Sequence, residues 1–271
     1  MNKQFIYAFI ACSIFIFSAC RKKPAPEPNY NEANLASLSI EFDNVVGGEN
    51  LALNTAEYTN AAGETYNIQV LQYFISNIKV TKADGTTYTV PQDSSYFLVK
   101  ETEPDTRFAK VMVPEGNYTS LTFTVGVDSL RSTMDISERT DVLEPSGHEG
   151  GMYWGWNSGY IFLKMEGESP QAPVDGTGKR RYRYHIGGFG GYSAPTINNI
   201  KTITIDLNER GIARVRKDRK ANIHLLADIG KVLSGSTAVS IAANPQVMFS
   251  DYSVNIANNY ATMFSHDHTE N

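Results

Sequence analysis

The side chains of this sequence that could hold a metal ion are imidazoles and thioethers, because the chain has only two cysteines. Imidazole and thioether together suit copper, so histidines close to methionines attract attention first. His148 lies four residues before Met152, and Met263, His266 and His268 lie together at the C-terminus. Each group also has a plain structural explanation, a solvated turn for His148 and a mobile polar end for the terminal residues.

His185 has the most informative context of the five histidines. It ends the alternating segment 179–186 (KRRYRYHI) and precedes the glycine-rich turn 187–191. A ring at this position can face a pocket at the rim of a sheet, although a rim histidine bonded to backbone is an equally simple interpretation. His224 alternates with Ile223 and Leu225, which favours an exposed or hydrogen-bonded histidine on a strand.

Both tryptophans, Trp154 and Trp156, lie in the stretch 151–167 (GMYWGWNSGYIFLKMEG). Its first half surrounds bulky rings with glycines, and its second half, Tyr160 to Lys164, is typical of a buried strand. The tryptophans are therefore either core anchors of a β-domain or members of a site.

Residues 1–20 are expected to form a bacterial lipoprotein signal rather than part of the fold. Lys3 precedes an apolar run that is short for a membrane span, and small residues lead to Cys20. Cleavage before Cys20 and acylation of its thiol and amino group would anchor the protein to a membrane. An uncleaved hydrophobic anchor is the alternative. Since Cys12 also lies in the signal, a cysteine nucleophile, an iron–sulfur cluster and a zinc–thiolate site are excluded.

The rest of the chain predicts one β-domain on a tether. Residues 21–36 form a proline-rich spacer, residues 37–256 the domain, and residues 257–271 a polar tail. Alternating segments bounded by turn residues predict an all-β, antiparallel sandwich or barrel of roughly ten strands. One or two short helical turns are expected, at residues 135–143 and 226–233.

Composition and motifs narrow the function. The formal charge of −5 argues against a nucleic-acid partner. No metalloprotease, nucleophile-elbow or phosphate-loop motif is found, since the glycine-rich turn 187–191 leads into a strand and not a helix. We therefore expect a protein that is not an enzyme.

Four segments together resemble the MbnP-like domain family over about residues 38–256. They are 73–78 (YFISNI), 123–128 (FTVGVD), 151–160 (GMYWGWNSGY) followed by Lys164, Glu166 and Gly167, and 184–188 (YHIGG). The resemblance implies a secreted copper-binding β-domain of a family associated with methanobactin, a copper-chelating natural product. It also implies that a partner di-haem enzyme resembling MauG oxidises a tryptophan to kynurenine beside the copper.

On this resemblance the candidates for the modified residue are Trp154 and Trp156, and His185 is the first candidate ligand. His148 and Met152, and more weakly Met263, His266 and His268, complete the candidate set. The expected function is a lipid-anchored copper-binding or copper-handling protein in the outer membrane, on its periplasmic or its surface side. The alternative is a metal-free surface lipoprotein that holds glycans or a protein through rings such as Trp156 and Tyr160.

Overall fold

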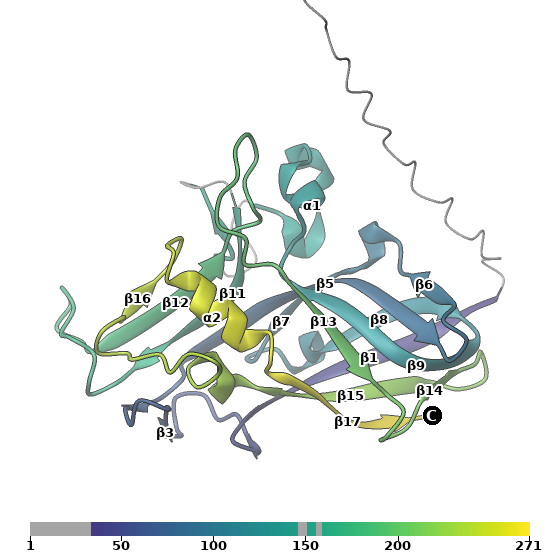
Figure 1. The fold of residues 1–271 in the computed structure, drawn as a ribbon, viewed down its shortest axis with the longest axis horizontal. Helices are drawn as coiled ribbons and strands as arrows, with labels where there is room; N and C mark the ends of the chain where they lie inside the picture. The colour runs from purple at the N-terminus through teal and green to yellow at the C-terminus, as the bar shows by residue number, and fades with distance from the viewer. Residues whose placement is uncertain (1–33, 146–150, 156–158) are drawn as a thin grey trace, which may run out of the picture. The chain divides into compact units, whose positions relative to one another are not determined.

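Two β-sheets pack face to face and form the body of the protein (Figure 1). The structure, a computed structural model, describes residues 34–145, 151–155 and 159–271. Two short α-helices accompany the sheets, α1 (Ser129–Thr133) and α2 (Ser253–Tyr260). The prediction of an all-β domain with few helical turns is confirmed.

The smaller sheet has the strand order β17-β15-β1-β2, and β8 also pairs with β1. Its strands are β1 (Leu35–Val46), β2 (Glu49–Asn50), β8 (Phe108–Pro114), β15 (Ala221–Asp228) and β17 (Phe264–Glu270).

The larger sheet has the order β13-β9-β5-β11-β12-β16, with β14 on β9, β6 and β7 on β5, and β10 on β11. These strands are β5 (Val70–Lys82), β6 (Thr87–Thr89), β7 (Tyr96–Lys100), β9 (Gly116–Val125), β10 (Tyr153–Trp154), β11 (Gly159–Glu168), β12 (Arg181–Gly187), β13 (Lys201–Asp206), β14 (Ala213–Val215) and β16 (Gln246–Val247). A separate hairpin joins β3 (Tyr58–Thr59) to β4 (Thr65–Tyr66), and single 3₁₀ turns are η2 (Gln92–Ser94), η3 (Pro104–Arg107), η4 (Ile136–Glu138), η5 (Asp141–Leu143) and η6 (Ile229–Val232).

An aromatic cluster between the two sheets forms the centre of the core. Phe42 of β1 meets Phe123 of β9 edge to face, with ring centroids 5.5 Å apart, and Phe264 of β17 meets Phe123 at 5.1 Å. Tyr73 of β5 closes the group against Phe42 at 6.4 Å. Because the rings come from both sheets, their burial holds the sandwich together.

Two strand pairs depart from the predicted antiparallel pattern. β1 pairs with β15, and β12 with β16, in parallel. A parallel pair needs a long connection, and nearly the whole domain separates β1 from β15 along the chain. The sheets are therefore mixed.

The break predicted near residues 76–77 of the central strand β5 is confirmed. Asn77 has a positive φ of 53°, and the register between β5 and β9 shifts between Ser76 and Lys79. Asparagine tolerates this left-handed conformation better than most residues.

The C-terminal part of the chain differs from its prediction. The sequence interpretation ended the domain at residue 256 and placed a polar tail after it, whereas α2 runs through that boundary and β17 adds an edge strand to β15. Half-exposed edge strands are polar on one side, so the segment lacks the apolar run of a buried strand. Residues 135–143 hold the two 3₁₀ turns η4 and η5 instead of a regular helix, and residues 226–233 contain η6.

Candidate metal centre

The outward face of strands β11 and β12 carries the histidine that the sequence singled out. The two strands are antiparallel, and Lys164 lies opposite His185. Alternating burial along both strands turns Met165 and Tyr184 into the core and leaves Lys164, Glu166 and His185 half-buried on the outer face.

A short hydrogen bond joins His185 to Glu166. Nε2 of His185 lies 2.6 Å from Oε1 of Glu166, with 14% of the histidine side chain and 26% of the glutamate side chain exposed. This hydrogen bond lowers the pKa of Glu166 and outweighs the opposing effect of burial. The carboxylate is then ionised and can only accept, so Nε2 of His185 donates and Nδ1 is the nitrogen left for another partner.

Such a carboxylate–imidazole pair is what metal sites use to orient a histidine ligand. The carboxylate therefore supports a metal held through Nδ1 of His185. Lys164 does not add to this support, because its Nζ, 3.9 Å from the same Oε1, offsets part of the negative charge of Glu166.

Trp154 lies further along β12 than this pair, over Gly187. It belongs to β10 and pairs with Gly159 of β11, and its ring meets Phe249 edge to face at 6.3 Å. A Cβ on Gly187 would lie 2.7 Å from Cζ3 of Trp154, so the ring covers this glycine closely. Gly187 is two residues after His185 on β12, and residues two apart on a strand lie on the same face of the sheet. The indole of Trp154 therefore lies on the same outer face as His185.

Trp154 is also part of the core, at 5% exposed, in a buried apolar cluster that includes Leu143, Met152 and Phe162. An indole offers a donor and no acceptor, so an unmodified Trp154 cannot ligate a metal through its ring nitrogen. The thioether of Met152 is 3% exposed within that cluster and belongs to its packing.

Three candidates, His148, Trp156 and Cys20, lie outside the residues that the structure describes. Their proposed roles stay predictions.

The three C-terminal candidates lie on β17 or just before it, and their side chains do not form one group. Met263 is fully buried, and Nε2 of His266 lies 2.9 Å from Oγ1 of Thr269, with burial lowering the pKa of His266. His268 instead lies beside His224 and Asp267, a pairing that the sequence interpretation missed. The alternation of His266 and His268 was visible in the sequence, but their register against β15 was not.

The chain matches a known protein family and resembles a solved structure. The MbnP family matches residues 36–249 of the chain. The solved structure of MbnP from Methylosinus trichosporium is similar with a TM-score of 0.52 and 16% sequence identity, covering 79% of this chain and 83% of that one. Comparison with curated proteins gives no match. Within the described residues, no helix is both long and apolar enough to cross a membrane.

Fold and site together define a two-sheet β-domain with a carboxylate–histidine pair on the outer face of the larger sheet. More specifically, the chain belongs to the MbnP family, whose match covers most of its length.

Proposed function

We propose that this protein is a lipid-anchored, extracytoplasmic copper-binding protein in which Nδ1 of His185 is a ligand. The observation that carries the proposal is the hydrogen bond between His185 and Glu166 on the outer face of β11 and β12, in a chain of the MbnP family. Imidazole is a good ligand for copper, and a fixed tautomer makes it a better one.

The role of each residue follows from its contacts. Glu166 holds the proton on Nε2 of His185 and so presents the lone pair of Nδ1. Trp154 packs over Gly187, two residues after His185 on β12. Bound copper would supply a redox-active or transportable ion, and no step of catalysis is assigned to the protein.

Trp154 contributes directly to such a site only after oxidation. Kynurenine, which replaces one carbon of the tryptophan residue by one oxygen, offers a ketone oxygen and an aromatic amine as donors. The family resemblance assigns this oxidation to a partner di-haem enzyme and leaves Trp154 and Trp156 as the two candidates.

The test is a copper titration of the purified full chain against its His185→Ala variant. His266→Ala is the matched control, because His266 is also a half-buried strand histidine, on the other sheet. We expect a copper site whose affinity falls in His185→Ala and not in His266→Ala. Equal copper affinity in the parent and His185→Ala contradicts the proposal.

Tyr160, one of the two rings that the glycan-binding alternative would use, is not accessible. Tyr160 is 2% exposed, and its hydroxyl donates to the backbone oxygen of Leu143, so it cannot stack on a sugar. Tyr192, which is 81% exposed near Phe189 and Phe249, is the ring that this alternative would use. Loss of glycan binding in Tyr192→Ala, with no copper in the parent, would favour it.

A further inference from the structure

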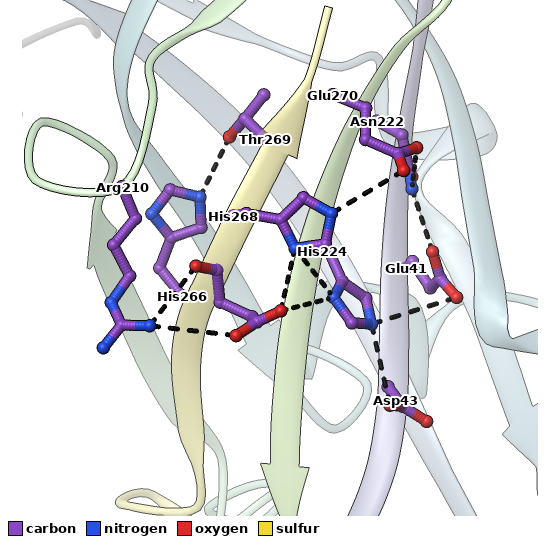
Figure 2. Close-up of polar contacts among 10 residues, drawn as sticks. Glu41, Asp43, Arg210, Asn222, His224, His266, His268, Thr269 and Glu270 are labelled. Atoms are coloured by element: carbon purple, nitrogen blue, oxygen red, sulfur yellow. Dashed lines mark hydrogen bonds and ion pairs between the residues drawn. The ribbon is translucent and has the colours of Figure 1, made fainter.

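A second group of metal-ligating side chains lies on the smaller sheet, at the pair β15 and β17 (Figure 2). It consists of His224, Asp267 and His268. Ile223 and Leu225 point into the core, so His224 points outward from the smaller sheet, whereas His185 points outward from the larger one. The two groups therefore lie on opposite outer faces of the sandwich.

The three side chains direct their ligand atoms at one another. Nδ1 of His224 and Nδ1 of His268 are 3.3 Å apart. Oδ2 of Asp267 lies 3.0 Å from the first nitrogen and 2.8 Å from the second. Two imidazole nitrogens and one carboxylate oxygen thus form a compact triangle.

A β-bulge in β17 makes this triangle. His268 pairs with His224, but the neighbouring Leu225 pairs with His266, so the strand carries Asp267 as an extra residue. In a regular strand Asp267 and His268 would point to opposite faces. The bulge re-aims Asp267 so that both residues reach His224, as bulges do at functional sites.

The outer nitrogens of the two histidines face carboxylates. Nε2 of His224 lies 3.6 Å from Oδ2 of Asp43 and 4.0 Å from Oε1 of Glu41, both on β1, and Nε2 of His268 lies 3.6 Å from Oε1 of Glu270. Figure 2 shows these groups on the outer sides of the two rings. Without a metal, the Asp267 carboxylate can only accept, so it takes hydrogen bonds from Nδ1 of His224 and from Nδ1 of His268. A metal in the triangle would replace these two protons, and the outer carboxylates lie near Nε2 of each ring, where a proton then remains.

Local charge also favours a cation. Four carboxylates, those of Glu41, Asp43, Asp267 and Glu270, lie at or next to the triangle. Among the described residues two cationic groups pair with them, Arg210 at 3.8 Å from Oδ1 of Asp267 and Arg107 at 3.7 Å from Oδ1 of Asp43, so carboxylates outnumber cations.

We propose that His224, Asp267 and His268 form a second metal site, for a divalent first-row transition-metal ion such as Zn²⁺. Metal–nitrogen bonds of about 2.0–2.1 Å in a tetrahedral site separate the ligand atoms by about 3.3 Å, close to the edges of the triangle. His268, 48% exposed, leaves the outer side open to solvent, so water completes the coordination. Asp267 and His268 lie beyond residues 36–249, so the family match includes only His224 of the three ligands.

The test is Zn²⁺ binding to the full chain carrying His185→Ala, measured by equilibrium dialysis with metal analysis. This background lacks the proposed copper ligand His185, so Zn²⁺ binding reports on the second site alone. The copper titration of the parent tests the first site separately. We expect one bound Zn²⁺ per chain. Adding His268→Asn should weaken it at least about 100-fold, because loss of an outer-shell partner alone costs about 10–100-fold.

Two further variants separate ligation from folding. His268→Cys keeps a ligand atom at the position and should retain Zn²⁺, whereas His268→Asn should not. His266→Ala changes a histidine of the same strand that bonds Thr269 and should bind as the background does. Absence of Zn²⁺ binding in the background, equal binding by His268→Asn, or equal loss in His266→Ala would each overturn the proposal.

Discussion

Gly187→Ala should displace Trp154 and destabilise the rim of the larger sheet. The added Cβ would lie 2.3 Å from the backbone oxygen of Tyr160, and 2.7 Å and 3.1 Å from Cζ3 and Cη2 of Trp154. Rotation of the indole can relieve the last two contacts, but the first involves the backbone of β11. Overpacking costs about 1–3 kcal/mol, and the backbone contact places this variant at about 2–3 kcal/mol.

The measurement is urea unfolding of the purified chain, together with the fluorescence of Trp154 in a Trp156→Phe background. We expect a lower midpoint, a melting temperature lower by roughly 4–12 °C, and red-shifted emission as the indole gains water. Gly155→Ala is the matched control, because its Cβ would meet nothing within 4 Å and its stability should change by less than about 0.5 kcal/mol. Equal stability and emission for Gly187→Ala and the parent would refute the packing argument.

Three further predictions concern substitutions of carboxylate side chains. In a copper titration, Glu166→Gln should lower the copper affinity about 10–100-fold without unfolding the domain. Glu168→Gln is the control, because Glu168 lies on the same face of β11 but pairs with Lys179, and it should leave the copper affinity unchanged. Buried Glu64 accepts hydrogen bonds from Asn60, Ser240 and the backbone of residues 241–242, so Glu64→Gln should cost about 2 kcal/mol at pH 7 in urea unfolding. Burial would raise the pKa of Glu64, but these hydrogen bonds lower it below its unfolded value, so its contribution is full above about pH 4.3 and is lost as pH falls through the folded pKa. The parent should therefore lose more stability than Glu64→Gln below about pH 4.3, and an equal loss would contradict this assignment. Asp128→Ala should destabilise the chain by about 2–3 kcal/mol, because Tyr96, Asn77, Gln92 and the first turn of α1 all donate to that carboxylate, and an unchanged unfolding midpoint would contradict it.

Local patterns in the sequence predicted much of the fold. The break in β5 was visible because a polar Ser76-Asn77 pair interrupts an alternating strand, and the buried strand after Trp156 was visible as an apolar run. The parallel pairing of β1 with β15 was not visible, because no local signal records which distant strand a segment meets. Helix α2 was missed because SVNIANNY has no side-chain cap and few strong helix formers.

The candidate sites likewise combine local features, which the sequence shows, with long-range contacts, which it does not. His185 was found from its position between an alternating segment and a glycine turn, which are local features. Its partner Glu166 and the covering ring of Trp154 come from neighbouring strands. His224 was set aside as an ordinary strand histidine because Asp267 and His268, which face it, are more than 40 residues away in sequence.

Copper ligation by His185 is tested most directly by metal analysis and peptide mass spectrometry on one sample of the protein from its native host. We expect bound copper whose amount falls in His185→Ala expressed in the same host. We also expect a peptide containing Trp154 or Trp156 to carry the mass of kynurenine, in which one oxygen replaces one carbon of tryptophan. If neither the unmodified nor the kynurenine-bearing protein holds copper, the protein is not a copper-binding protein.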